Sequence, residues 1–162
     1  MFLVNRFFWA ILGMFSIAFH ISLIFSGLVP NLVSRPLHMV FALPWILVFT
    51  SKTISERALG IIHCFVSTWL CLWIVFNEEK LGEQYGSLED GFQVVASVIL
   101  LISVIEMARR AIGWPLPLVA LIALLYGIFG QHVPGEFGHP GTPINSFLGT
   151  LIIAEGGIWG KL

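Results

Sequence analysis

Long apolar runs separated by short polar stretches occupy most of this 162-residue chain. The hydrocarbon core of a bilayer takes roughly 20 apolar residues of helix to cross, and several runs approach that length. They cover residues 7–29, 32–50, 57–76, 91–107 and 112–129. Helices are expected because lipid offers the backbone no hydrogen-bond partners, so each segment must satisfy its own amides. The pattern therefore predicts an all-α integral membrane protein with about five transmembrane helices.

Prolines modify two of these runs. Pro44 lies inside the second run, and a proline in a helix interior removes a hydrogen bond and kinks the helix. Pro115 and Pro117 follow Trp114 at the start of the fifth run, where proline costs little because the first amides of a helix lack partners anyway. We expect a kinked second helix and a fifth helix that begins near Trp114.

The chain after the fifth run has a different character. The stretch QHVPGEFGHPGTP contains too much Pro and Gly for regular structure. Residues 144–154 then place apolar side chains at helical spacing on one face, which suits a helix lying in the membrane interface or docked against a partner. We divide the chain into a helical bundle, residues 1–130, and a periplasmic loop, interfacial helix and junction, residues 131–162.

Composition supports this interpretation. Hydrophobic residues make up 57% of the chain and charged residues only 10%, whereas soluble domains carry about 25% charged residues. The formal net charge of −1 argues against nucleic acid as a partner, because nucleic-acid binding needs a basic surface. Both cysteines lie inside one apolar run, so neither a disulfide framework nor a zinc site is expected. The first run is too long for a signal-peptide core and is interpreted as a retained span.

The distribution of charge predicts an orientation. Cytoplasmic loops of membrane proteins are enriched in Lys and Arg. With the N-terminus in the cytoplasm, most basic residues fall on the cytoplasmic side, and only Arg35 and Lys80 fall outside. The acidic stretch of residues 77–90 then faces the periplasm. The residues placed on the cytoplasmic side are Arg6, Lys52, Arg57, Arg109 and Arg110.

Glu106 is the only acidic residue deep in a predicted span. An acid within a membrane is a candidate for proton or cation coupling. Arg109 and Arg110, however, follow it at three and four residues, on the same helix face and within ion-pair reach. We favour a structural ion pair between Glu106 and these arginines.

A face of small residues is predicted along the third span. Gly60, Cys64, Ser67 and Cys71 recur at intervals of three and four residues, which lets another backbone approach closely. A reactive thiol is the weaker interpretation, because burial raises a thiol's pKa. We expect close helix packing at this face.

Two histidines in the spans raise an alternative function, a membrane-anchored redox subunit that carries haem or a quinone. A haem needs both ligands level with its iron. At 1.5 Å of rise per residue, His20 lies about 20 Å from the cytoplasmic end of its span and His63 about 10 Å from that end of its own. Polar contacts between packed helices are therefore favoured for both histidines. With no nucleophile–base pair and no phosphate-binding loop, the chain is not expected to be an enzyme or to hold a cofactor.

Two polar loops are predicted to face the periplasm. One contains Glu83, Tyr85 and Glu89, and the other contains His132 and Glu136. They could form a docking surface for a soluble binding protein, or they could be solvated loops without a partner. Together with His139, the second loop matches no tight metal site in its spacing.

Several motifs in residues 73–160 carry a family resemblance. The most specific is Glu-x-x-Arg-Arg followed by Gly-Trp-x-Leu-Pro. An acidic loop with Tyr85, a Leu-rich span closing on Pro-Gly, and a Glu-Gly pair before an apolar residue and Gly accompany it. This part of the chain resembles the first part of permeases of the TAXI-type tripartite ATP-independent periplasmic (TRAP) transporters. The residues concerned are Glu83, Tyr85, Glu106, Arg109, Arg110, Gly113, Trp114, Leu116, Pro117, Pro134, Gly135, Glu155, Gly156, Ile158 and Gly160.

This resemblance implies a small (Q-type) membrane subunit, or the N-terminal portion, of a TAXI-type TRAP permease in a bacterial or archaeal cytoplasmic membrane. Such a chain braces a large elevator-type (M-type) subunit that takes up an organic acid or amino acid by symport. A periplasmic TAXI solute-binding protein delivers the solute, and Na⁺ or H⁺ is the coupling ion, expected in the large subunit. Glu155, Gly156 and Trp159 are then expected at the junction with the large subunit. Either a second polypeptide carries that subunit, or this chain is part of a longer product.

Overall fold

The computed structural model describes residues 2–27, 29–154 and 157–160, and these residues form helices and loops without a strand. Five helices among them are long and apolar enough to cross a membrane. The all-α fold with span-length helices is thus confirmed for the described residues. The spans are α1 (Phe2–Ser26), α2 (Asn31–Pro44) continued by η1 (Trp45–Phe49), α3 (Ile54–Phe76), α5 (Gly91–Ile112), and α6 (Pro115–Phe129) continued by η2 (Gly130–His132).

The other helical segments of the described chain are short: α4 (Glu78–Glu83), η3 (Gly135–Phe137) and α7 (Ile144–Ile152). The spans start and end near the predicted residues, with two larger differences. α1 begins at Phe2 instead of residue 7. α5 continues to Ile112 instead of ending at residue 107. Its last turn stays helical because Arg109 and Arg110 are paired there with Glu106 on the same helix.

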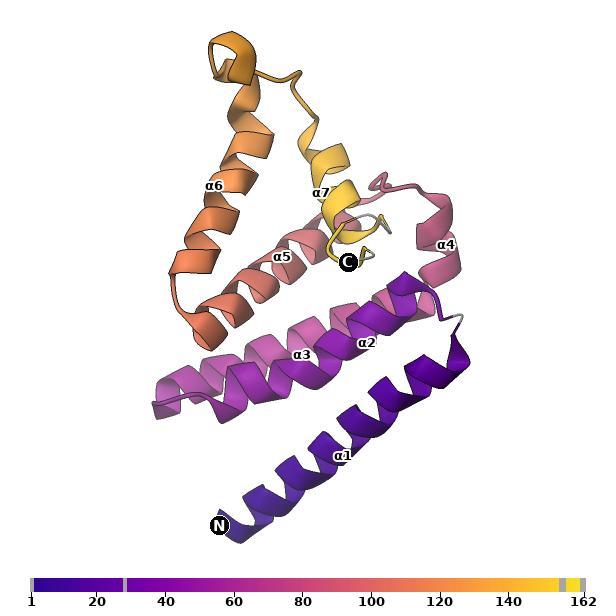
Figure 1. Ribbon diagram of the computed structural model, residues 1–162, viewed down its shortest axis with the longest axis vertical. Helices are drawn as coiled ribbons and strands as arrows, with labels where there is room; N and C mark the ends of the chain where they lie inside the picture. Colours follow the sequence, from indigo (N-terminus) through magenta and orange to yellow (C-terminus); the bar gives the residue numbers. More distant parts are fainter. Residues whose placement is uncertain (1, 28, 155–156, 161–162) are drawn as a thin grey trace.

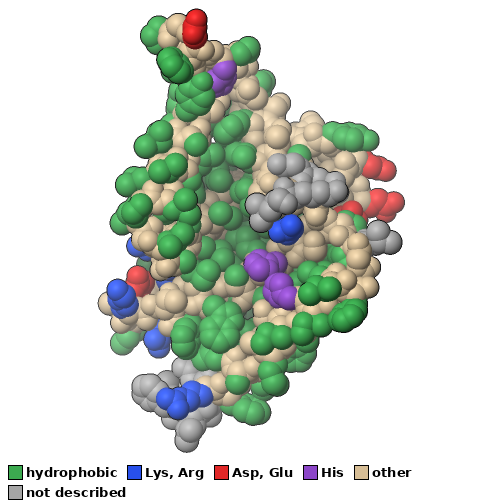
Figure 2. All heavy atoms as spheres, in the orientation of Figure 1, with side chains coloured by type: hydrophobic (Ala, Val, Ile, Leu, Met, Phe, Trp, Pro, Cys, Tyr) green, Lys and Arg blue, Asp and Glu red, His purple; other side chains and the backbone are tan. Residues whose placement is uncertain are grey.

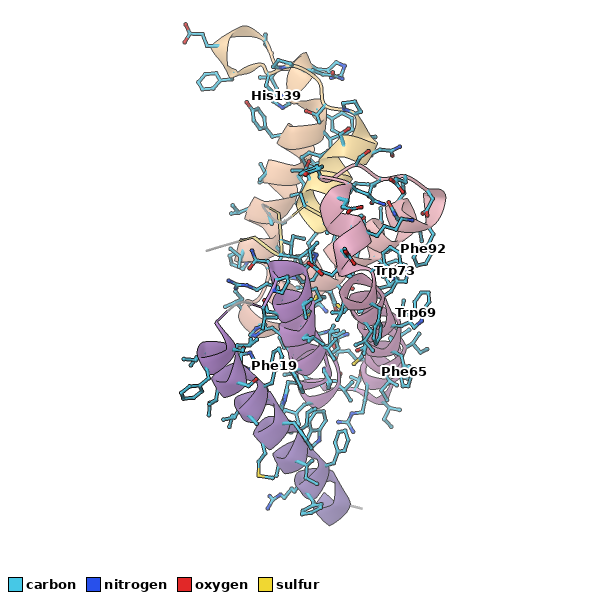
Figure 3. The ribbon with its side chains drawn as sticks, turned by 90° about the vertical axis from the view of Figure 1, so that its right-hand side faces the viewer. Phe19, Phe65, Trp69, Trp73, Phe92 and His139 are labelled. Carbon is cyan, nitrogen blue, oxygen red and sulfur yellow. The ribbon has the colours of Figure 1, made fainter. Side chains whose placement is uncertain are left out.

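Neighbouring spans run antiparallel (Figure 1). Near the N-terminus of α1, the ring of Trp9 lies 4.9 Å from that of Trp45, near the end of the second span. At the junction of α3 and α5, the end of one helix meets the start of the other. There the ring of Trp73 lies 4.9 Å from that of Phe92 in an edge-to-face arrangement (Figure 3). Because α1 lies at the edge of the bundle, against α2, only 6% of the residues in its most apolar stretch are buried within the chain.

The core lies where α2, α3, α5 and the C-terminal segment meet. Neither α1 nor α6 contributes a residue to the buried cluster found among the described residues. The two helices are therefore peripheral, and α6 diverges from α5 after the turn that joins them (Figure 1). The cluster comprises Leu32, Met39, Leu43, Leu47, Leu70, Cys71, Ile74, Leu81, Ala96, Leu100, Ile152, Ile153 and Trp159.

Pro44 changes the type of helix rather than only its direction. α2 ends at Pro44, and Trp45–Phe49 continues the span as a π-helical turn. Proline has no amide hydrogen to give to the preceding turn, and π-helical segments occur mostly as single turns within α-helices. The last carbonyls of this turn lie near α3, which matters for the charged cluster described below.

The amphipathic helix α7 lies against the rest of its own chain on one side. It packs against its own chain: Leu148, Gly149 and Ile152 are buried, and α5 and α7 are in contact. A methyl group added at Gly149 would collide with the carbonyl oxygen of Gly86. The absence of a side chain at Gly149 thus lets α7 approach the loop before α5, and the chain itself covers part of the apolar face of α7, whereas Ile144 is 56% exposed.

Candidate functional site

The charged cluster predicted from the sequence centres on Glu106, which accepts hydrogen bonds from two arginines. Arg109 donates from Nε to Oε2 and from Nη2 to Oε1, both at 2.7 Å. Arg110 donates from Nε to Oε1, also at 2.7 Å. The guanidinium–carboxylate pair of Arg109 is bidentate, the geometry that gives such pairs their strength. Glu106 is thus fully engaged by its own helix.

Arg110 also ties this helix to the second span. Its Nη1 donates to the carbonyl oxygen of Leu47 at 2.8 Å and to Oγ of Ser51 at 3.1 Å. The Leu47 carbonyl belongs to the π-helical turn after Pro44. Because the Arg110 side chain is only 10% exposed, the cluster joins η1 and α5 through a largely buried charge.

The small residues of α3 lie at two different contacts. Gly60 is buried, and a methyl group there would collide with the carbonyl oxygen of Leu47. Ser67 and Cys71 are also buried, whereas Cys64 is half-buried. The structure therefore places Gly60 against η1 and Ser67 against α5, with Cys71 in the core.

Two polar side chains of α3 lie within hydrogen-bond distance of Ser103 on α5. His63 Nε2 lies 2.8 Å from Ser103 Oγ, and Ser67 Oγ lies 2.7 Å from the same oxygen. Ser103 in turn donates to the carbonyl oxygen of Ile99 at 2.7 Å. Between apolar helices, such hydrogen bonds hold the two helices together in a defined orientation.

His20 contacts a histidine that the sequence analysis did not single out. Its Nε2 lies 2.5 Å from Nδ1 of His38 on α2, and its Nδ1 donates to the carbonyl oxygen of Ser16. His20 and His63 thus take part in separate contacts, one between α1 and α2 and the other between α3 and α5.

The residues predicted for docking do not form one patch on the face shown in Figure 2, where acidic side chains appear beyond α6 and, separately, near α4. Glu83, Tyr85 and Glu89 are exposed around α4, and Lys80 lies 3.7 Å from Glu89. Tyr85 has a positive φ of 49° and is 91% exposed. The other two, His132 and Glu136, are exposed in the loop beyond α6.

His139 fastens that loop to the end of α6 (Figure 3). Its Nδ1 lies 2.7 Å from the carbonyl oxygen of Pro140 and its Nε2 lies 3.0 Å from that of Tyr126. Tyr126 also donates its hydroxyl to the carbonyl oxygen of Phe137 at 2.6 Å. Since both ring nitrogens face acceptors, first Pro140 and then Tyr126 raise the pKa of His139 above its ordinary value of 6.5.

Of the residues expected at a junction with a larger subunit, Glu155 and Gly156 lie outside the described residues. Trp159 is described and is only 3% exposed. It belongs to the buried cluster of the chain, so its indole is not a free surface for another subunit. Packing against apolar groups of its own chain thus buries a residue that was expected at the junction with the large subunit.

The sequence analysis missed the partners of the polar residues rather than the residues themselves. Ser103 precedes Glu106 by three residues, so the spacing that linked Glu106 to Arg109 also placed Ser103 near this side of α5. His38 follows Arg35 by three residues on α2, so helical spacing also places these two side chains on one side of the helix. The contact between Arg110 and Leu47 had no local signal, because it joins residues far apart in the chain.

The described residues contain no group of three or more His, Cys, Asp or Glu side chains that could hold a metal ion. Comparisons of the chain with protein families, with curated proteins and with solved structures found no match.

Proposed function

We propose that this chain is a multi-pass membrane protein of the cytoplasmic membrane with its N-terminus in the cytoplasm. The apolar character of its outward surface supports this. Large hydrophobic side chains are exposed along α1, α3, α5 and α6, for example Phe15 at 64%, Phe65 at 77% and Ile122 at 67%. A water-soluble monomer rarely exposes large contiguous apolar patches, whereas a lipid environment favours such a surface.

The position of charge supports the same proposal. Arg109 and Arg110 lie at the end of α5, and Lys52 and Arg57 lie around the start of α3. The acid-rich helix α4 follows the other end of α3. With the basic end in the cytoplasm, the arrangement follows the enrichment of Lys and Arg on that side of a membrane.

Within that setting, we propose that the chain is the small membrane subunit of a TAXI-type TRAP transporter. It would brace a large elevator-type subunit that takes up an organic acid or amino acid with Na⁺ or H⁺. The observation that carries this proposal is the motif around Glu106, Arg109 and Arg110, the most specific part of the family resemblance. These residues form a paired cluster that ties α5 to η1, which suits a rigid support and leaves Glu106 fully paired by arginine.

The periphery of the bundle supports a role beside another subunit. α6 is apolar on all sides, yet Pro117 is the one residue of Pro115–Phe129 that is buried. A helix apolar all round is typical of a position within a membrane or within a larger protein. In our proposal the large subunit packs along α6, a periplasmic TAXI solute-binding protein delivers the solute, and the coupling ion binds in the large subunit.

A transport assay tests this division of labour. The chain alone and the complex isolated with its membrane partner are each reconstituted into liposomes that carry a Na⁺ or a proton gradient. Solute-binding protein loaded with radiolabelled organic acids or amino acids is then added. Uptake is expected for the complex only. Gradient-driven uptake by the chain alone would refute the proposal of a bracing subunit.

The redox alternative has a simple test of its own. His20 and His38 are in direct hydrogen-bond contact, and His63 is bonded to Ser103, so the described contacts do not favour a haem between His20 and His63. A Soret band in the purified protein would replace our proposal with a haem-carrying subunit.

A further inference from the structure

Two cavities adjoin one another at Arg35 and His38 on α2. The first, of about 260 Å³, lies between α1 and α2 and is also lined by His20, Asn31 and Ser34. The second, of about 310 Å³, lies between α2, α5 and the C-terminal segment. Its other lining residues include Met39, Ala42, Ile46, Met107 and Trp159. The first cavity therefore has a mixed polar and apolar lining, the second is mainly apolar, and Arg35 and His38 line both.

Two side chains that line the second cavity, Arg35 and Trp159, have donors without an acceptor among the described residues. Arg35 has no hydrogen bond or ion pair with any residue that the structure describes. Trp159 is only 3% exposed, and its Nε1 has no acceptor among the described residues. A guanidinium and an indole N–H can only donate, and an unpaired buried donor is costly. Arg35 and Trp159 therefore have donors that no acceptor among the described residues uses.

The histidine pair can add a further donor. Nδ1 of His20 donates to the carbonyl oxygen of Ser16, and Nε2 of His20 faces Nδ1 of His38. Nε2 of His38 is the ring nitrogen of this pair that has no partner among the described residues. If the pair holds one proton beyond its neutral state, Nε2 of His38 carries a hydrogen whichever ring bears the charge. The pair is thus able to donate to an anion.

The charge of the described lining residues favours an anionic ligand. No acidic residue is present among the described residues that line either cavity. A metal cation beside Arg35 would be repelled without a compensating carboxylate. An anionic phosphate, in contrast, matches the fork of donors that a guanidinium presents.

The apolar cavity indicates that the ligand also has an apolar portion. From Arg35, the residues Met39, Ala42 and Ile46 follow one face of the second span at intervals of four, three and four residues. The distance from Arg35 to Ile46 is about 16 Å at 1.5 Å per residue. One leaflet of a hydrocarbon core about 30 Å thick has nearly this depth. In the proposed orientation, Arg35 lies near the periplasmic surface and Ile46 lies deeper.

We propose that this site binds one membrane phospholipid, with its phosphate at Arg35 and His38 and an acyl chain along Met39, Ala42 and Ile46. Figure 2 shows the two histidine side chains together, beside a basic side chain and surrounded by hydrophobic ones. The lipid would fill the space between α2, α5 and the C-terminal segment and so hold that segment against the bundle. This inference rests on the membrane insertion proposed above and is independent of the transporter assignment.

Native mass spectrometry of the detergent-purified protein, with any subunits that accompany it, tests the site. After delipidation, the protein is titrated with phosphatidylglycerol and with a diacylglycerol of the same acyl chains, which lacks the phosphate. We expect one phosphatidylglycerol to bind at least about tenfold more tightly than the diacylglycerol, the effect of a charge-assisted hydrogen bond. Arg35→Gln should remove this preference. Ala42→Phe, which fills the apolar cavity, should weaken binding of both lipids.

Arg57→Gln is the matched control, because Arg57 is an exposed arginine away from both cavities and its loss should leave the titration unchanged. The proposal is overturned if Arg35→Gln binds phosphatidylglycerol as the wild type does, or if both lipids bind the wild type equally. Displacement of phosphatidylglycerol by inorganic phosphate, with Ala42→Phe unaffected, would instead reveal a site for a free anion. A chain absent from the membrane fraction would contradict the membrane insertion itself, whereas a membrane-extracted chain without a bound lipid would contradict only this inference.

Discussion

At the scale of single residues, Arg110 is the side chain that does most to join separate parts of the chain. It donates to Glu106 on its own helix and to the carbonyl oxygen of Leu47 on the second span. Arg109 is paired with the same carboxylate but is 30% exposed, against 10% for Arg110. The two neighbouring arginines therefore differ in what their loss leaves behind, although their sequence context is nearly the same.

Arg110→Gln should lower the free energy of unfolding by about 1–3 kcal/mol, because it leaves buried acceptors without their charged donor. Arg109→Gln should cost less, since solvent reaches that pair and screens it. The measurement is thermal unfolding of both variants in the same detergent. Equal losses for the two variants would show that the contact between Arg110 and Leu47 contributes little.

His139 gives a prediction about pH. The carbonyl oxygens of Pro140 and Tyr126 raise its pKa above 6.5 in the folded protein. Its contribution to the stability of the loop is then fully present below pH 6.5 and is lost as pH rises through the folded-state pKa. An NMR titration of the His139 ring should give a midpoint above 6.5, and hydrogen exchange of residues 130–140 should accelerate as the ring loses its proton. A midpoint at or below 6.5 would contradict this arrangement.

At the scale of helices, hydropathy was sufficient to predict the spans, because length and apolar character decide whether a helix can cross a bilayer. The structural detail inside the spans needed tertiary contacts. Pro44 signalled a break, and a π-helical turn follows it. Likewise, the apolar face of α7 was visible in the sequence. Its burial against its own chain depends on the approach of Gly149 to Gly86, and no local pattern encodes that approach.

The candidate site likewise has one part that the sequence predicted and another part that depends on tertiary contacts. The pairing of Glu106 with Arg109 and Arg110 follows helical spacing, and the distances show all three in one cluster. The partner of His20 could not be derived, because it depends on how α1 lies against α2. The family resemblance implied that Trp159 lies at the junction with a large subunit, whereas here it belongs to the buried cluster of the chain.

Close packing of α3 against η1 gives a prediction at this scale. Gly60→Ala should destabilise the protein by about 1–3 kcal/mol, because the added methyl group would collide with the Leu47 carbonyl and force the helices apart. Gly82→Ala is the matched control: Gly82 lies in helix α4 with open space around it, so alanine should stabilise it slightly through its helix propensity. Unfolding midpoints that fall equally in both variants would contradict the close approach.

At the scale of the whole molecule, the account predicts a membrane topology. In a background with Cys64 and Cys71 replaced by Ala, Glu83→Cys should react in intact cells with a thiol reagent that cannot cross the membrane. Ser55→Cys, at the opposite end of α3, should react only after the cells are permeabilised. The expected pattern follows from an acidic periplasmic loop and a basic cytoplasmic end. The reverse pattern would place the N-terminus in the periplasm.

The whole bundle is also asymmetric. Its core lies among α2, α3 and α5, while α1 and α6 expose apolar surface and contribute nothing to the buried cluster found among the described residues. Helices of this kind need lipid or another subunit beside them. A small subunit that braces a larger one would present such a surface, and the motif around Glu106 lies on α5, next to the helix that diverges.

The most direct test of this account is to isolate the tagged chain from its native membranes in a mild detergent and to identify the accompanying proteins by mass spectrometry. We predict a stoichiometric and very hydrophobic partner larger than this chain, accompanied under some conditions by a soluble periplasmic protein. A chain that emerges alone, homogeneous and stable, would contradict the assignment as a bracing subunit.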